Sequence, residues 1–173
     1  YLSNNFVKAV ELYRKAFEAA EKTGDRISQS KALTDLGICA DINGEMDRAR
    51  KFFKQGIIAA KEVNDIESVA FANSELGVSY SFTNELVYAK KNYIAGYELY
   101  KKLGNSIRLA LLSNNLGKLY MNFFDYKSAL KYFEEGIQFA GDDKRAQALN
   151  LIGLADVYAN LSNYSKALKY YRE

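Results

Sequence analysis

A period of about 40 residues runs through this sequence and constrains its fold more than any other feature. The alanines that mark the period recur at steps of 40, 40, 40 and 38 residues, and they are Ala9, Ala49, Ala89, Ala129 and Ala167. An aromatic residue follows each alanine by four positions, at Tyr13, Phe53, Tyr93, Phe133 and Tyr171. Such self-similarity is typical of stacked repeats, in which each unit buries its apolar face against its neighbours.

A small residue after a leucine also recurs at this period. The pairs are Leu36-Gly37, Leu76-Gly77, Leu116-Gly117 and Leu154-Ala155. We expect the small residue to lie where the two helices of a repeat cross closely, with the repeating alanine filling the matching site. The aromatic residues are then expected to wedge between successive helix pairs.

Composition favours helices and a continuous core. Hydrophobic residues make up 49% of the 173 residues, and the chain has 11 glycines and no proline. The net charge is +3, from 24 basic and 21 acidic residues that are mixed along the sequence. Without a basic block, neither nucleic-acid binding nor membrane-surface binding is expected. No apolar stretch is long enough to predict a membrane-spanning helix, so membrane insertion is not expected either.

Amphipathic spacing and turn residues predict helices joined by tight turns. The sequence predicts helix B of a first repeat at residues 4–23. It then predicts four A–B helix pairs, at about residues 26–64, 66–104, 106–141 and 144–173. We expect residues 1–173 to form a single domain, and to be a fragment of a longer protein.

The pattern resembles the tetratricopeptide repeat, whose motif joins Leu-Gly-x2-Tyr to Ala-x3-Phe. The strongest matches are Leu76-Gly77 with Tyr80, and Leu116-Gly117 with Tyr120. The tryptophan and the proline of the family are absent, and Ala40 stands where the later repeats have tyrosine. Similar long repeats occur in bacterial peptide receptors and signalling proteins and in kinesin-light-chain-like adaptors.

The resemblance implies an all-α fold, a right-handed α-solenoid of antiparallel helix pairs with about four and a half repeats. It implies a protein- or peptide-binding module that mediates protein–protein interaction through its concave face. The alternative is a sensor or regulatory domain of a bacterial signalling protein, such as a kinase, cyclase or transcription regulator, acting by conformational change or dimerisation. Homo-oligomerisation through open solenoid ends is a third hypothesis.

The residues that ordinary catalytic and metal sites need are missing. The chain has no histidine, and its single cysteine, Cys39, excludes an intrachain disulfide. The glycines do not form a phosphate-binding loop. We therefore expect no enzyme activity, no cofactor and no metal. A cytoplasmic location fits the single cysteine.

The resemblance also places candidate binding residues on the A helices, which line the concave face of tetratricopeptide arrays. The positions lie one and two residues before the leucine of each Leu-Gly pair, and two, five and six residues after it. The candidate peptide-binding residues are Asn114, Asn115, Lys118, Asn122, Ser74, Glu75, Asp35 and Asp156. In related proteins, asparagines of helix A hold the main chain of the peptide, and this role carries over to Asn114 and Asn115. The acidic residues predict a ligand with a basic or neutral segment. The alternative is that these residues are solvated polar side chains facing an empty groove.

Overall fold

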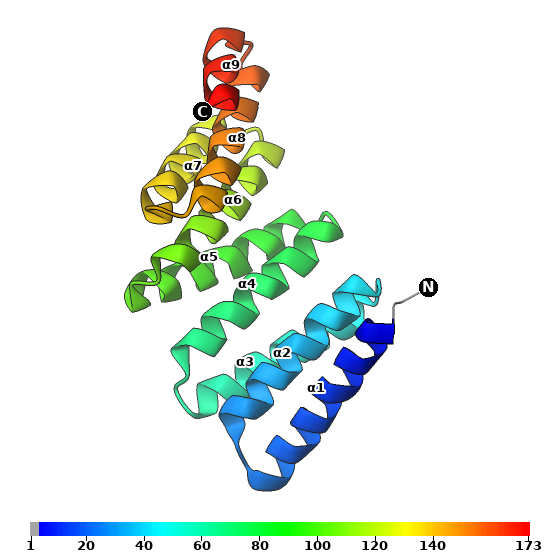
Figure 1. Ribbon diagram of the computed structural model, residues 1–173. Helices are drawn as coiled ribbons and strands as arrows, with labels where there is room; N and C mark the ends of the chain where they lie inside the picture. The colour runs from blue at the N-terminus through cyan, green and yellow to red at the C-terminus, as the bar shows by residue number, and fades with distance from the viewer. Residues whose placement is uncertain (1–3) are drawn as a thin grey trace. The chain divides into compact units, whose positions relative to one another are not determined.

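The computed structural model describes residues 4–173. Over this range the chain forms helices and no strand. The helices are α1 (Asn4–Thr23), α2 (Arg26–Ile42), α3 (Met46–Glu62), α4 (Ile66–Phe82), α5 (Leu86–Leu103), α6 (Ser106–Asn122), α7 (Tyr126–Ala140), α8 (Lys144–Asn160) and α9 (Tyr164–Arg172) (Figure 1). The fold is therefore all-α and consists of successive helix pairs, as the sequence predicts. Each range expected for a repeat contains one A–B pair.

Capping side chains begin most of these helices. The carboxylate of Asp65 accepts a hydrogen bond from the backbone N–H of Ser68, and Asn105 does the same for Arg108. Equivalent caps come from Asp25, Asp125, Asp143 and Asn163. Because the first N–H groups of a helix have no partner within it, these short polar side chains fix where each helix starts.

A residue with a positive φ lies in every described turn. Four are glycines, Gly24, Gly44, Gly104 and Gly141, and four are other residues, Asn64, Asn84, Phe124 and Ser162. A left-handed residue after a helix satisfies its last carbonyl groups and reverses the chain. The turns thus share a residue of positive φ although they differ in sequence, and Gly141 lies outside the left-handed helical region because its ψ is −121°.

Most of the repeating alanines and aromatic residues lie in the core, whereas Ala9 and Tyr13 are half-buried and Tyr171 is 51% exposed. Ala49, Ala129, Phe53 and Phe133 are completely buried, and Tyr93 is 3% exposed. The sequence correctly marks these positions, but their packing differs in part from the expectation.

The aromatic ring of helix B lies against the small residue of its own pair, and this contact is closer than the sequence predicts for a ring placed between successive pairs. A methyl group placed on Gly37 would come within 2.5 Å of the Phe53 ring, and one on Gly77 within 2.5 Å of the Tyr93 ring. Phe133 also reaches the next pair, where a methyl group on Gly153 would lie 2.2 Å from it. The ring occupies the space that a side chain on helix A would need, and the small residue leaves that space free.

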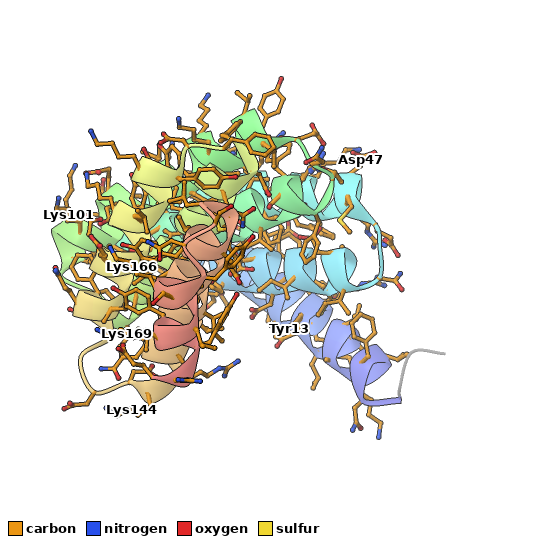
Figure 2. The ribbon with its side chains drawn as sticks, turned by 90° about the horizontal axis from the view of Figure 1, so that it is seen from above. Tyr13, Asp47, Lys101, Lys144, Lys166 and Lys169 are labelled. Atoms are coloured by element: carbon orange, nitrogen blue, oxygen red, sulfur yellow. The ribbon has the colours of Figure 1, made fainter. Side chains whose placement is uncertain are left out.

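The chain divides into two compact units, with the division between Leu99 and Tyr100. In the N-terminal unit, α2 packs against α1, α3 and α4, and Tyr13 of α1 lies on the side of α1 that faces α2 (Figure 2). In the C-terminal unit, α8 packs against α6, α7 and α9. A single continuous domain over the whole chain stays a prediction.

Candidate functional site

A hollow of about 420 Å³ opens between α2 and α4 in the N-terminal unit, and we call it the α2–α4 groove. Its lining is Ile38, Asp41, Ile42, Met46, Glu75, Val78 and Phe82. All of these except Met46 occupy the A-helix positions that the Leu-Gly register predicts to face the concave side. Glu75 is thus the one residue of the candidate set that lines this hollow.

The lining is mainly apolar and partly open to solvent. Ile42 is 66% exposed and Phe82 is 72% exposed, whereas Ile38 and Val78 are half-buried. Ile38 and Ile42 are four positions apart, as are Val78 and Phe82, which places each pair on one face of its helix. Adjacent exposed apolar side chains around a hollow are typical of an interaction site.

Two carboxylates give the groove an acidic character. Asp41 accepts a hydrogen bond from the hydroxyl of Ser79 on α4 at 2.9 Å. Burial raises the pKa of Asp41, against the opposing effects of the Ser79 hydrogen bond and the Arg50 charge. Glu75 is half-buried on the facing helix. Together they favour a cation near the apolar hollow.

The other candidates of the N-terminal unit are Asp35 and Ser74. Asp35 is half-buried on α2, and burial raises the pKa of its carboxyl group. The Ser74 hydroxyl donates to the carbonyl of Ala70 in its own helix at 2.9 Å. Neither residue lines the α2–α4 groove.

The candidates on α6 have different environments. Asn114 is only 4% exposed, and its amide donates to the carbonyl of Leu149 on α8 at 2.8 Å. Its amide donor therefore serves the packing of α6 against α8. Asn115 is half-buried, while Lys118 and Asn122 are exposed on the same helix.

Asp156 lies on α8 in the C-terminal unit, where it is half-buried. Its carboxylate accepts a hydrogen bond from the hydroxyl of Tyr171 on α9. Hydrogen bonding and the charge of Asp156 raise the pKa of Tyr171. Asp156 is thus engaged with the last helix of the chain.

Sequence reasoning did not include Met46 in the groove. The repeat register could have indicated it, because Met46 precedes the repeating Ala49 by three residues and begins α3 beside the turn that follows α2. No group of three or more potential metal ligands occurs among residues 4–173. Over the same residues, no helix combines the length and the apolar character needed to cross a lipid bilayer.

Two protein-family models match parts of this sequence. The family model for a tetratricopeptide repeat matches residues 109–140. This segment therefore contains a tetratricopeptide repeat. The family model for anaphase-promoting complex subunit 5 matches residues 1–84, just under half of the sequence. No curated protein sequence matches the chain.

Solved structures of this repeat class are similar over nearly the whole chain. BtubC (BKLC) from P. vanneervenii is 24% identical with a TM-score of 0.86, and the match covers 96% of this chain and 70% of that one. A Rap protein complexed with Competence and Sporulation Factor is 17% identical with a TM-score of 0.81, covering 97% and 48% of the two chains. A STAND protein with a tetratricopeptide repeat sensor from Pyrococcus horikoshii is 20% identical with a TM-score of 0.84, covering 96% and 26%. At these identities the likeness shows a shared fold.

Proposed function

We propose that this tetratricopeptide protein is a protein-interaction module that binds a peptide segment of a partner through its A helices. The observation that carries the proposal is the α2–α4 groove, a hollow of about 420 Å³ with exposed apolar walls at the positions the repeat register assigns to the concave face. A pocket of this size accepts one large side chain of a peptide. The Rap structure, which was solved with Competence and Sporulation Factor bound, supports the class of function.

The ligand that fits the groove combines an apolar side chain with a neighbouring basic one. The apolar side chain would contact Ile42 and Phe82, which lose water on binding. The basic group would lie near Asp41 and Glu75, whose attraction to it is strengthened because both are half-buried. Binding is a sufficient function for these residues, and we assign no catalytic role to the module.

The C-terminal unit extends the proposal to its own A helices. Asn115, Lys118 and Asn122 on α6 and Asp156 on α8 are the polar residues that we propose for this part of the binding surface. Asn115 and Asn122 carry amide groups that can both donate to and accept from a peptide backbone. Lys118 adds a cation for an acidic residue of the ligand.

A peptide array probed with the purified chain tests the proposal. We expect it to select peptides in which a large apolar residue is adjacent to lysine or arginine. Ile42→Ser and Phe82→Ser should each weaken binding of a selected peptide by about tenfold, since each removes an apolar contact worth about 1.5–3 kcal/mol when fully buried.

Val87→Ser is the matched control for these variants. Val87 is 72% exposed on α5, as Phe82 is on α4, but it does not line the groove. Its substitution should leave binding unchanged. Selection of no such peptides, or equal binding by Ile42→Ser and wild type, would disprove the proposed mode.

A regulatory role within a signalling protein is the second candidate. It is favoured by the similarity to the Pyrococcus horikoshii STAND protein, in which the tetratricopeptide repeats are a sensor. In that case ligand binding in the groove would control an adjoining catalytic or DNA-binding region. Sequencing the gene on both sides of this segment tests it, because an adjoining region of that kind is required.

A further inference from the structure

The first A helix lacks a tyrosine that the later A helices share. Three residues after the small residue of the Leu-Gly or Leu-Ala pair, α4, α6 and α8 carry Tyr80, Tyr120 and Tyr158. At the same register position, α2 carries Ala40. Comparing the surroundings of these positions shows what replaces the missing ring.

Each of the three tyrosines stacks on another aromatic ring, and cations also contact the rings of Tyr80 and Tyr158. Tyr80 stacks on Tyr88 with ring centres 5.2 Å apart, Tyr120 on Tyr132 at 5.3 Å, and Tyr158 on Tyr170 at 5.6 Å. The Arg50 guanidinium is 4.2 Å and the Lys54 ammonium 5.9 Å from the centre of the Tyr80 ring, and Lys166 is 4.9 Å from that of Tyr158.

Counterparts of these aromatic and cationic groups are present around Ala40. By repeat register, Phe52 occupies the place of Tyr132 and Tyr170. Arg14 occupies the place of Lys54, and Arg48 that of Lys166. The Arg48 guanidinium already lies 5.5 Å from the centre of the Phe52 ring.

Between these groups is a hollow of about 400 Å³, which we call the α1–α3 hollow. Its lining is Phe6, Val7, Val10, Glu11, Arg14, Leu36, Cys39, Ala40, Asn43, Glu45, Arg48 and Phe52. The counterpart of Arg50 here is Val10, so the cation that covers Tyr80 is also missing. Apolar side chains thus line much of the space that a ring fills in the later repeats, together with the charged groups of Glu11, Arg14, Glu45 and Arg48.

The α1–α3 hollow and the α2–α4 groove lie on opposite faces of α2. Leu36, Cys39 and Ala40 line the hollow, whereas Ile38 and Asp41 line the groove. Because successive residues of a helix are rotated by about 100°, the residues that line the hollow lie on the side of α2 opposite to those that line the groove. The two sites can therefore be occupied independently.

We propose that the α1–α3 hollow receives a tyrosine side chain from a partner protein. The chain itself places tyrosine side chains at the equivalent positions, so the chemistry that fits this hollow is a phenol ring carried on a polypeptide. Stacking on Phe52 and contact with the cations Arg14 and Arg48 both require an aromatic face, which an aliphatic side chain lacks. This inference does not rest on binding in the α2–α4 groove.

Cys39 provides the first readout. It is the only cysteine of the chain, lines the hollow and is 8% exposed. The rate at which a thiol reagent modifies it therefore reports whether the hollow is filled. With N-acetyl-tyrosinamide as the probe, we expect saturable slowing of the modification. N-acetyl-leucinamide at equal concentration should slow it at least threefold less, and equal effects of the two probes, or no slowing by either, would overturn the proposal.

Ala40→Tyr supplies the missing ring from within the chain. We expect this variant to have a higher Tm and to lose the effect of N-acetyl-tyrosinamide on Cys39. Ala40→Ser keeps the hollow open and should retain the effect. If Ala40→Tyr folds and still shows full tyrosinamide protection, the probe binds elsewhere and the assignment is wrong.

Phe52→Ala tests the assignment even if Ala40→Tyr does not fold. Removing the stacking wall should raise the Kd of N-acetyl-tyrosinamide about threefold to tenfold, as the strength of an aromatic pair implies. Ile42→Ala, on the other face of α2, should leave this Kd unchanged. An unchanged Kd in Phe52→Ala, or an equal loss in Ile42→Ala, would refute stacking in the α1–α3 hollow.

Discussion

Arg50 and Glu85 form an ion pair that joins α3 to the start of α5, with Nη1 and Oε1 2.7 Å apart. The Arg50 side chain is only 11% exposed, and it also covers the Tyr80 ring and donates to the carbonyl of Ser79. One side chain thus links three successive helices of the N-terminal unit. Its methylene groups and its charge contribute together to this packing.

Replacing Arg50 by alanine should lower the free energy of unfolding by about 2 kcal/mol, because it uncovers Tyr80 and leaves the Ser79 carbonyl without this donor. Arg48→Ala is the matched control. Arg48 lies on the same helix as Arg50 and pairs with Glu45 at 2.8 Å, but its side chain is 53% exposed. Its loss should cost less than about 1 kcal/mol. Urea unfolding of both variants checks the difference, and equal costs would show that burial of Arg50 does not matter.

A methyl group at Gly77 should disrupt the contact with the Tyr93 ring. Because it would lie 2.5 Å from that ring, Gly77→Ala should destabilise the protein by about 1–3 kcal/mol despite the better helix propensity of alanine. The same substitution in a Tyr93→Leu background should cost less, because the side chain that clashes is gone. A double-mutant cycle measured by chemical denaturation gives the coupling. Additive effects would contradict direct contact as the cause.

Phe124 has a left-handed backbone conformation with a φ of 56°, at the turn between α6 and α7. It is 77% exposed, so its ring contributes little burial in return for the strain. Phe124→Gly should therefore stabilise the protein by about 1 kcal/mol, since glycine adopts this conformation without a side-chain clash.

Gly44→Ala is the converse substitution at an equivalent turn. Gly44 has a φ of 81°, and a methyl group placed on it would have no heavy atom within 4 Å, so only the backbone conformation opposes alanine. The substitution should lower stability by about 1 kcal/mol. Thermal unfolding of the two variants checks both signs. A lower Tm for Phe124→Gly would mean that the Phe124 ring stabilises the turn.

The repeat register fixes which side of a helix each residue occupies, but of the candidate peptide-binding residues only Glu75 lines the α2–α4 groove, and peptide binding there stays a prediction. Ile38, Asp41 and Phe82 were placed by counting from a Leu-Gly pair, and the spacing alone sufficed. The α1–α3 hollow was not predicted. The sequence displays Ala40 in place of tyrosine, but whether its neighbours close over the gap depends on the packing of three helices. The sequence does not give that packing.

Asn114 shows a second limit of reading the sequence. Three asparagines and a lysine on one helix suggested contacts with a peptide, and Asn115, Lys118 and Asn122 stay candidates for that role. Asn114 lies two residues before the leucine of its Leu-Gly pair, as the buried Thr34 does in α2. In α6 this position faces α8, and the amide of Asn114 donates to the carbonyl of Leu149 there. The residue type reveals a hydrogen-bond donor, but only the packing reveals its acceptor.

Tyr93 should make the stability of the protein depend on alkaline pH. Burial raises the pKa of its phenol from 10.0 to about 12, against the opposing effect of a hydrogen bond with Ser81. The folded protein therefore favours the neutral phenol, and in the unfolded chain the pKa returns to about 10. The resulting stabilisation is fully present below pH 10 and is lost as the pH rises from about 10 to about 12, because the unfolded chain releases its proton first.

Urea unfolding between pH 8 and pH 12 tests this contribution. The free energy of unfolding of the wild type should fall by up to about 2–3 kcal/mol more over this range than that of Tyr93→Phe. Taking the difference between the two proteins removes the titration of the other tyrosines and the lysines. If the curves of Tyr93→Phe and wild type are parallel instead, the phenol of Tyr93 ionises as readily in the folded protein as in the unfolded chain. In that case the Tyr93 ring is not shielded from water where it contacts Gly77.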